Sequence, residues 1–111
     1  MEELELKKIL EVEQKIVTEL DGVHVDCGNR DWSECRLSYI EEIKKAVRRI
    51  SEKIKPFSLR ERSMGYDDNA VVFTFALTLG DFEVSKIKVS SVLNPCHSQG
   101  GLCVSTSSWI V

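Results

Sequence analysis

Four cysteines and two histidines are the residues of this chain best suited to chemistry. They fall into two groups, each with two cysteines and a nearby histidine: His24, Cys27 and Cys35, then Cys96, His97 and Cys103. Four thiolate or imidazole ligands around one centre would form a tetrahedral zinc site. Structural zinc sites usually use Cys-x2-4-Cys spacings, whereas seven and six residues separate the paired cysteines here. The spacing does not favour zinc, and we expect no metal and no other cofactor.

The redox state of these cysteines depends on the compartment. Met1 is followed by Glu2, Glu3 and Glu5, the opposite of the basic start of a signal peptide, and no apolar run approaches the ~18 residues of a membrane span. We therefore expect a cytoplasmic protein whose cysteines are mostly reduced. The alternative is a disulfide between Cys96 and Cys103 across the last predicted hairpin, as an exported protein would allow.

Catalytic patterns are weak throughout the sequence. A nucleophilic cysteine needs a histidine held against its thiolate, but neighbours such as Cys96 and His97 point to opposite faces of an extended segment. Asp67 and Asp68 lie in a predicted turn, where aspartate is favoured for its backbone hydrogen bonds. Gly100-Gly101 precedes a strand, whereas a phosphate loop precedes a helix. The sequence predicts a protein that is not an enzyme.

Two arginines suggest an anion site. Arg60 and Arg62 are two residues apart on a predicted strand, so they would share a face and could both donate to one phosphate or carboxylate. Ser98 and Gln99, in a predicted turn, would add neutral donors. This pattern indicates a small anionic ligand such as a nucleotide, although polar residues also alternate on any solvent-facing sheet.

Charge is unevenly distributed along the chain, whose net charge is −3. Residues 1–35 hold four basic and ten acidic side chains, net −6, and residues 36–62 hold nine basic and four acidic ones, net +5. A basic helix face that includes Arg48 and Arg49 could contact nucleic acid. Glutamates interrupt that face and it has no aromatic residue for base stacking, so a solvated face, or attraction between an acidic and a basic helix, explains it better.

Protein binding is the function that the sequence favours. Trp32 and Trp109 are of the residue type most enriched at interface hot spots, and Arg48 and Arg49 could join them. We expect a small non-catalytic protein that acts by protein–protein interaction and forms a homo-oligomer. Its size and composition are compatible with an inhibitor of a host defence system, encoded by a phage or mobile element. The alternatives are capture of an anionic ligand and nucleic-acid contact through the basic helix.

The hydrophobic pattern changes near Pro56. Apolar residues recur every three or four positions before it and every second position after it. The pattern predicts helices over residues 2–20 and 38–55, and strands over residues 57–64, 70–79, 82–93 and 102–111. We therefore predict one α+β domain over residues 1–111, with two N-terminal helices packed on a four-stranded antiparallel β-meander.

Three details of this prediction are open. Glu13 lies within the apolar arc of the first helix, so we expect it either at the rim of the interface or in a buried pair with a lysine or arginine. Residues 23–25 could add a short strand, and Asp31 or Ser33 could start the second helix earlier than residue 38. The apolar end of strand 102–111 predicts a sheet edge that pairs with another chain.

Overall fold

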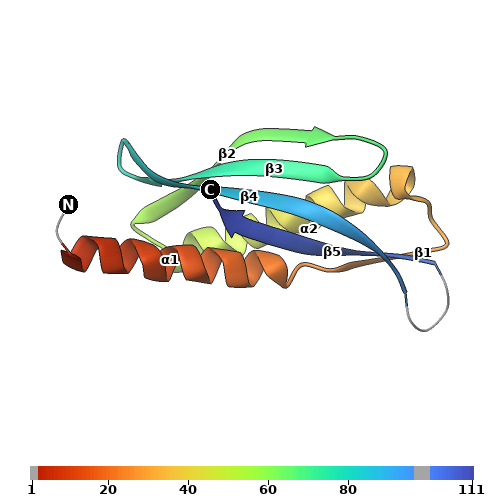
Figure 1. Ribbon diagram of the computed structural model, residues 1–111, viewed down its shortest axis with the longest axis horizontal. Helices are drawn as coiled ribbons and strands as arrows, with labels where there is room; N and C mark the ends of the chain where they lie inside the picture. The colour runs from red at the N-terminus through yellow and green to blue at the C-terminus, as the bar shows by residue number, and fades with distance from the viewer. Residues whose placement is uncertain (1–2, 97–100) are drawn as a thin grey trace.

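A computed structural model describes residues 3–96 and 101–111, with side chains from Glu5 onward. The described helices are α1 (Glu3–Asp21) and α2 (Trp32–Lys53). The described strands are β1 (Val25–Gly28), β2 (Phe57–Tyr66), β3 (Val71–Leu79), β4 (Phe82–Pro95) and β5 (Leu102–Ile110). All strand pairs are antiparallel, in the order β1-β5-β4-β3-β2 (Figure 1).

The α+β class and the meander of the last four strands are confirmed. The count of four strands is wrong, because β1 forms between the two helices and pairs with β5, with Val25 opposite Val104. Only α1 is therefore N-terminal to the whole sheet. The alternative of a short strand at residues 23–25 is confirmed only in part, because β1 begins at Val25 and continues to Gly28; it depends on a partner about 80 residues away in the chain.

The expected edge at the apolar end of strand 102–111 is present: β1 pairs only with Leu102–Val104, so residues 105–110 of β5 pair with β4 alone. Its pairing with another chain stays a prediction. The end of α1 contacts this segment at one position, where the Ser108 backbone N–H and hydroxyl donate to the Asp21 carboxylate at 2.9 and 2.6 Å. The other edges of the sheet are β1, which is short, and β2, which is charged and bulged. These features disfavour pairing with further strands.

Helix α2 begins earlier than residue 38. Asp31 is its N-cap, and its side chain accepts a hydrogen bond from the Glu34 backbone N–H at 3.0 Å. The hydrogen bond from the Ser33 hydroxyl, followed by the one from the Glu34 backbone N–H, holds the pKa of Asp31 below its usual value. The early start places Trp32 and Cys35 on the buried stripe of the helix.

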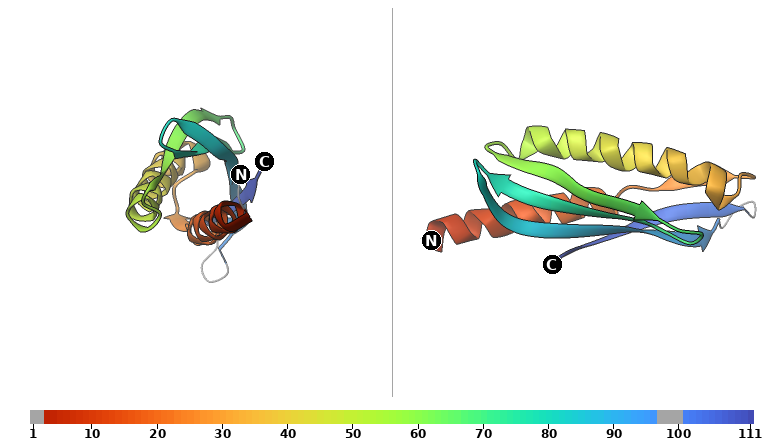
Figure 2. Two further views of the ribbon diagram at one scale, coloured as in Figure 1. Left: turned by 90° about the vertical axis from the view of Figure 1, so that its left-hand side faces the viewer. Right: turned by 90° about the horizontal axis from the view of Figure 1, so that it is seen from above.

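The sheet curls around the core, and the two helices close its concave side (Figure 2). Glu13 on α1 is half-buried at the rim of this interface and accepts a hydrogen bond from the Ser85 hydroxyl. Its partner is thus a serine, and the expected alternative of a buried pair with lysine or arginine is not formed. The largest fully buried side chains are Ile16, Leu20, Tyr39, Ile43, Ile50, Val71, Phe73, Phe75, Leu77, Ile87, Val89 and Val104.

Tyr39 links α2 to the sheet through a buried hydrogen-bond chain. Its hydroxyl lies 2.9 Å from the Thr106 hydroxyl, which donates to the Val23 carbonyl at 3.0 Å. Burial raises the pKa of Tyr39 to about 12, and the hydrogen bond with Thr106 opposes this shift. The folded protein therefore retains the phenol proton at pH values where the unfolded chain releases it.

This difference predicts a loss of stability at high pH. With an unfolded pKa of about 10, the contribution is fully present below pH 10 and should fall by about 2–3 kcal/mol as pH rises to about 12. Urea unfolding across this range should show a steeper decline for the wild type than for Tyr39→Phe, which lacks the buried phenol. If the free energy of unfolding declined equally in the two proteins, the loss of stability at high pH could not be assigned to Tyr39.

Candidate functional site

Two of the predicted site residues, Arg60 and Trp109, point outward from the same side of the sheet. Arg60 on β2 lies opposite Ala76 on β3, which lies opposite Lys86 on β4. In the next row on this side, Lys88 on β4 lies directly opposite Trp109 on β5. We call this side, which faces away from both helices, the convex face.

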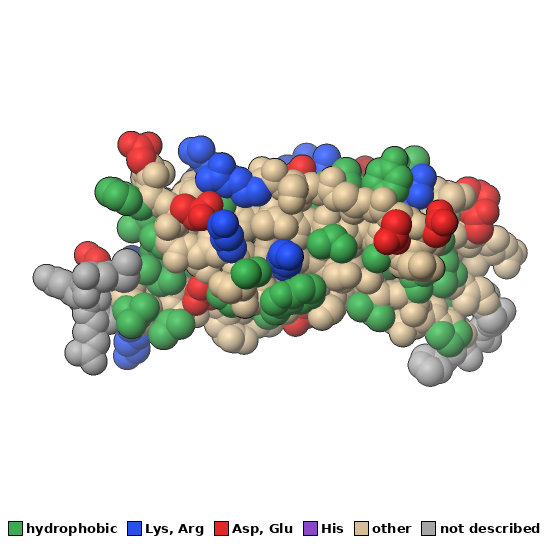
Figure 3. All heavy atoms as spheres, turned by 45° about the horizontal axis from the view of Figure 1, so that its top comes forward, with side chains coloured by type: hydrophobic (Ala, Val, Ile, Leu, Met, Phe, Trp, Pro, Cys, Tyr) green, Lys and Arg blue, Asp and Glu red, His purple; other side chains and the backbone are tan. Residues whose placement is uncertain are grey.

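The convex face is positively charged. Arg60, Lys86 and Lys88 are exposed on it, and Arg62 reaches it through an ion pair with Glu83 at 3.2 Å. Lys86 also lies 3.9 Å from Glu83, so these four cations and one carboxylate together carry a net charge of +3. Figure 3, which looks onto the sheet from outside, shows lysine and arginine side chains gathered over one part of this face.

Trp109 supplies the aromatic surface of this face. Its side chain is 43% exposed next to Lys88, and Val72 and Val92 are also exposed on the same side of the sheet. An aromatic side chain among valines and cations offers apolar contact and charge together, which is typical of a binding surface.

The predicted pair of arginines is not regularly arranged. The register of β2 shifts between Glu61 and Ser63, which makes Arg62 the additional residue of a β-bulge. Its guanidinium already donates to Glu83, whereas Arg60 has no ion-pair partner among the described residues. The strict alternation that would place both arginines on one anion is therefore interrupted. Ser98 and Gln99, the other predicted ligand residues, lie outside the described residues.

The remaining predicted partner residues lie elsewhere. Trp32 is only 8% exposed and its indole N–H donates to the Asp67 carbonyl at 3.4 Å, so it belongs to the core and not to an exposed partner surface. A tryptophan can occupy either a core or an interface position, so the residue type alone could not predict which one Trp32 has. Arg48 and Arg49 are exposed on α2, across the molecule from the convex face.

The expectation of reduced cysteines is wrong, because all four are paired as Cys27–Cys35 and Cys96–Cys103. The Cα atoms of the pairs are 5.6 and 5.2 Å apart, in the usual range for disulfides. Asp26 lies near the second pair, with 3.6 Å between its carboxylate and the Cys96 sulfur. Sulfurs bonded to each other are not thiolate ligands, so the described residues do not support the zinc alternative.

The sequence analysis did not select Lys86 and Lys88 as candidate site residues, although the alternation of the strand places them on its outward face. The strand that contains them buries Ile87 and Val89, so alternation alone places the two lysines on the opposite face. Their position beside Trp109 and Arg60 required the register of four strands, which no local pattern specifies.

We found no match to this chain among protein-family models, curated proteins or solved structures. Neither helix, over the residues that the structure describes, is long and apolar enough to span a membrane.

Proposed function

We propose that this protein is a non-catalytic binding protein whose convex face captures an acidic surface of a protein partner. The observation that carries this proposal is the direct pairing of Trp109 with Lys88, which belongs to a cluster of four cations and one carboxylate. Tryptophan and arginine are enriched among the residues that dominate interface energies. The surrounding cations would attract an acidic partner and orient it during encounter.

The dimensions of the molecule suit this role. It measures 51 × 25 × 22 Å, so a long side can supply the roughly 800 Å² per partner of a standard interface. Inhibition of a host defence system would be one instance of such binding. Recruitment of further copies of the chain would be another, although it does not explain the positive charge of the convex face.

The two alternatives have less support. Small-molecule sites are usually concave, whereas Arg60 and Lys86 project from an outward-curving sheet. Nucleic-acid contact through α2 would use Arg48 and Arg49, but Lys45 on the same helix is already paired with Glu41 and Glu42. Capture experiments with charge-reversed variants distinguish both alternatives from protein binding.

The test compares two double charge reversals of equal size. Lys86→Glu with Lys88→Glu should reduce capture of the partner from extracts of the producing cells by about tenfold, because both substitutions repel an acidic surface. Arg48→Glu with Arg49→Glu should capture as much partner as the wild type. Bound proteins and nucleic acids are identified by mass spectrometry and by nuclease-sensitive staining, and circular dichroism confirms that both variants fold.

The opposite pattern would contradict the proposal. If the Arg48 and Arg49 substitutions abolish capture while the Lys86 and Lys88 substitutions do not, α2 is the binding surface. Loss of bound nucleic acid in that variant would favour the nucleic-acid alternative specifically.

A further inference from the structure

The free edge of β5 ends in a segment without charge. Residues 105–110 pair with β4 alone, and no charged side chain occurs between Ser105 and Val111. In Figure 2, no other described strand lies beyond this part of β5. Charged side chains, prolines and bulges usually protect the edge of a sheet from further pairing. This segment has none of them, so it is suited to pair with another strand.

The backbone of the segment points alternately toward β4 and away from it. The Val111 N–H donates to the Lys86 carbonyl of β4 at 2.9 Å. The Ser108 N–H donates in the other direction, to the Asp21 carboxylate. By the same alternation, the N–H and carbonyl of Ile110 point away from β4, and neither has a hydrogen-bond partner among the described residues. Ile110 therefore presents one free donor and one free acceptor at the edge.

Apolar side chains flank these two groups on both faces of the sheet. Ile110 lies opposite the buried Ile87, so its side chain points to the concave side, where it is 40% exposed. Trp109 and Val111, its neighbours in the strand, point to the convex face and are also exposed. A strand that pairs here would cover apolar surface on both faces.

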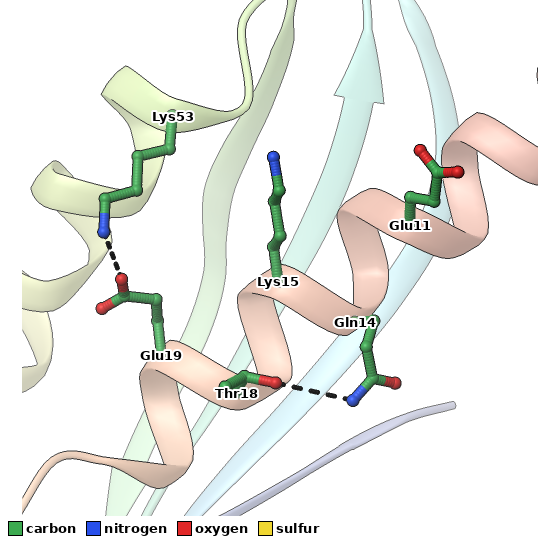
Figure 4. A pocket seen from close by; sticks show the side chains of 6 residues that line it. All are labelled: Glu11, Gln14, Lys15, Thr18, Glu19 and Lys53. Carbon is green, nitrogen blue, oxygen red and sulfur yellow. Dashed lines mark hydrogen bonds and ion pairs between the residues drawn. The ribbon is translucent and has the colours of Figure 1, made fainter.

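Helix α1 extends this apolar surface. Its Val17 carbonyl accepts a hydrogen bond from the Ser108 hydroxyl at 3.3 Å, so this side of the helix faces β5. Leu10 and Leu6 continue the same side at helical spacing, and both are exposed. The side toward α2 differs, because the residues that line the space there are all polar or charged (Figure 4): Glu11, Gln14, Lys15, Thr18, Glu19 and Lys53.

We propose that this edge pairs with the same edge of a second copy of the chain, which gives a two-fold symmetric dimer with one continuous sheet. In an antiparallel register with Ile110 opposite its own copy, each Ile110 N–H donates to the carbonyl of the other, so both free groups are satisfied. Trp109 of each chain then lies opposite Val111 of the other. The bond between Ser108 and Asp21 is kept and marks the point where the pairing ends.

The segment itself favours a second copy over a foreign strand. A strand that fits this edge needs a free donor, a free acceptor, no charge and an apolar side chain on each face, and residues 109–111 have all of these. The dimer does not depend on capture of an acidic partner. Ile110 points away from the convex face, so its substitution leaves Lys86, Lys88 and Trp109 in place.

Sedimentation equilibrium of the disulfide-bonded protein, from micromolar to millimolar concentrations, tests the dimer. We expect a reversible equilibrium between monomer and dimer for the wild type. Ile110→Lys should raise the dissociation constant of the dimer by about tenfold or more, because it places two ammonium groups opposite each other and removes apolar contact. Leu37→Lys, which introduces the same charge at an exposed apolar position of α2, should dimerise like the wild type.

Amide hydrogen exchange of the wild type tests the hydrogen bonds without any substitution. The Ile110 amide should exchange about tenfold more slowly when nine-tenths of the chains are dimeric, because only the monomer leaves it free. The Ser108 amide, bonded to Asp21 in both states, should exchange at one rate throughout. The proposal is overturned if the wild type stays monomeric, if Ile110→Lys dimerises as tightly as the wild type, or if a dimer forms without slowing exchange at Ile110. Loss of the dimer in Leu37→Lys would place the interface on α2 and would also overturn it.

Discussion

Replacement of Trp109 with alanine should weaken binding of the protein partner by about thirtyfold, which corresponds to about 2 kcal/mol and is typical of an interface hot spot. The indole is 43% exposed and lies directly opposite Lys88, so its removal takes apolar contact from the surface beside the cations. Equilibrium binding of the purified partner to immobilised wild type and variant measures the change.

A matched substitution separates this effect from general loss of apolar surface. Leu37 is 69% exposed on α2, so Leu37→Ala removes a large apolar side chain from a different surface and should change the affinity by less than about twofold. Trp109→Ala should unfold within a few degrees of the wild type, because the side chain lies outside the core. A folded Trp109→Ala protein with wild-type affinity would exclude the indole from the interface.

Removal of the Cys27–Cys35 disulfide should lower the free energy of unfolding by about 2–3 kcal/mol, because the bond closes a short loop that the unfolded chain would otherwise leave open. Both residues are buried, with exposures of 2% and 0%, so Cys27→Ala with Cys35→Ala also leaves a small void. The loss is large for a domain whose total stability is expected at about 5–15 kcal/mol. Urea unfolding of the double variant measures it.

The second disulfide provides the comparison. Cys96 and Cys103 close a loop of similar length but are half-buried, so Cys96→Ala with Cys103→Ala should cost less. Protein from its natural source should be four hydrogen atoms lighter than the fully reduced chain and should react with no thiol reagent until it is reduced. Four reactive thiols in the unfolded, unreduced protein, or a Cys27 and Cys35 double variant as stable as the wild type, would contradict this account.

Hydrophobic periodicity predicted the main elements of the fold. The observed β2, β3, β4 and β5 each overlap a predicted strand, because alternation is clear when one face of a long strand is buried. The start of α2 could also have been found, because Trp32, Cys35 and Tyr39 continue its buried stripe at spacings of three and four residues. The capping box at Ser38 favoured a later start, so the helix was predicted to begin at residue 38.

The features that the sequence left open depend on contacts between distant segments. β1 exists because it pairs with β5, and the disulfides form because the turns bring the sulfurs together. Trp32 and Trp109 are the same residue type, so the sequence predicts the same role for both. Only the structure shows that Trp32 is buried and Trp109 exposed. The sheet register likewise decides that Arg60 shares a face with Trp109 and that Arg62 occupies a bulge.

Site-specific photocrosslinking in the producing cells tests the convex face most directly. A benzophenone side chain replaces Val72 or Val92, both exposed on the convex face, and in a control replaces Leu37 on α2. The account predicts that an acidic protein is crosslinked from positions 72 and 92 but not from position 37, and that Lys86→Glu with Lys88→Glu abolishes the crosslink. Crosslinking of the partner from position 37 alone would contradict it.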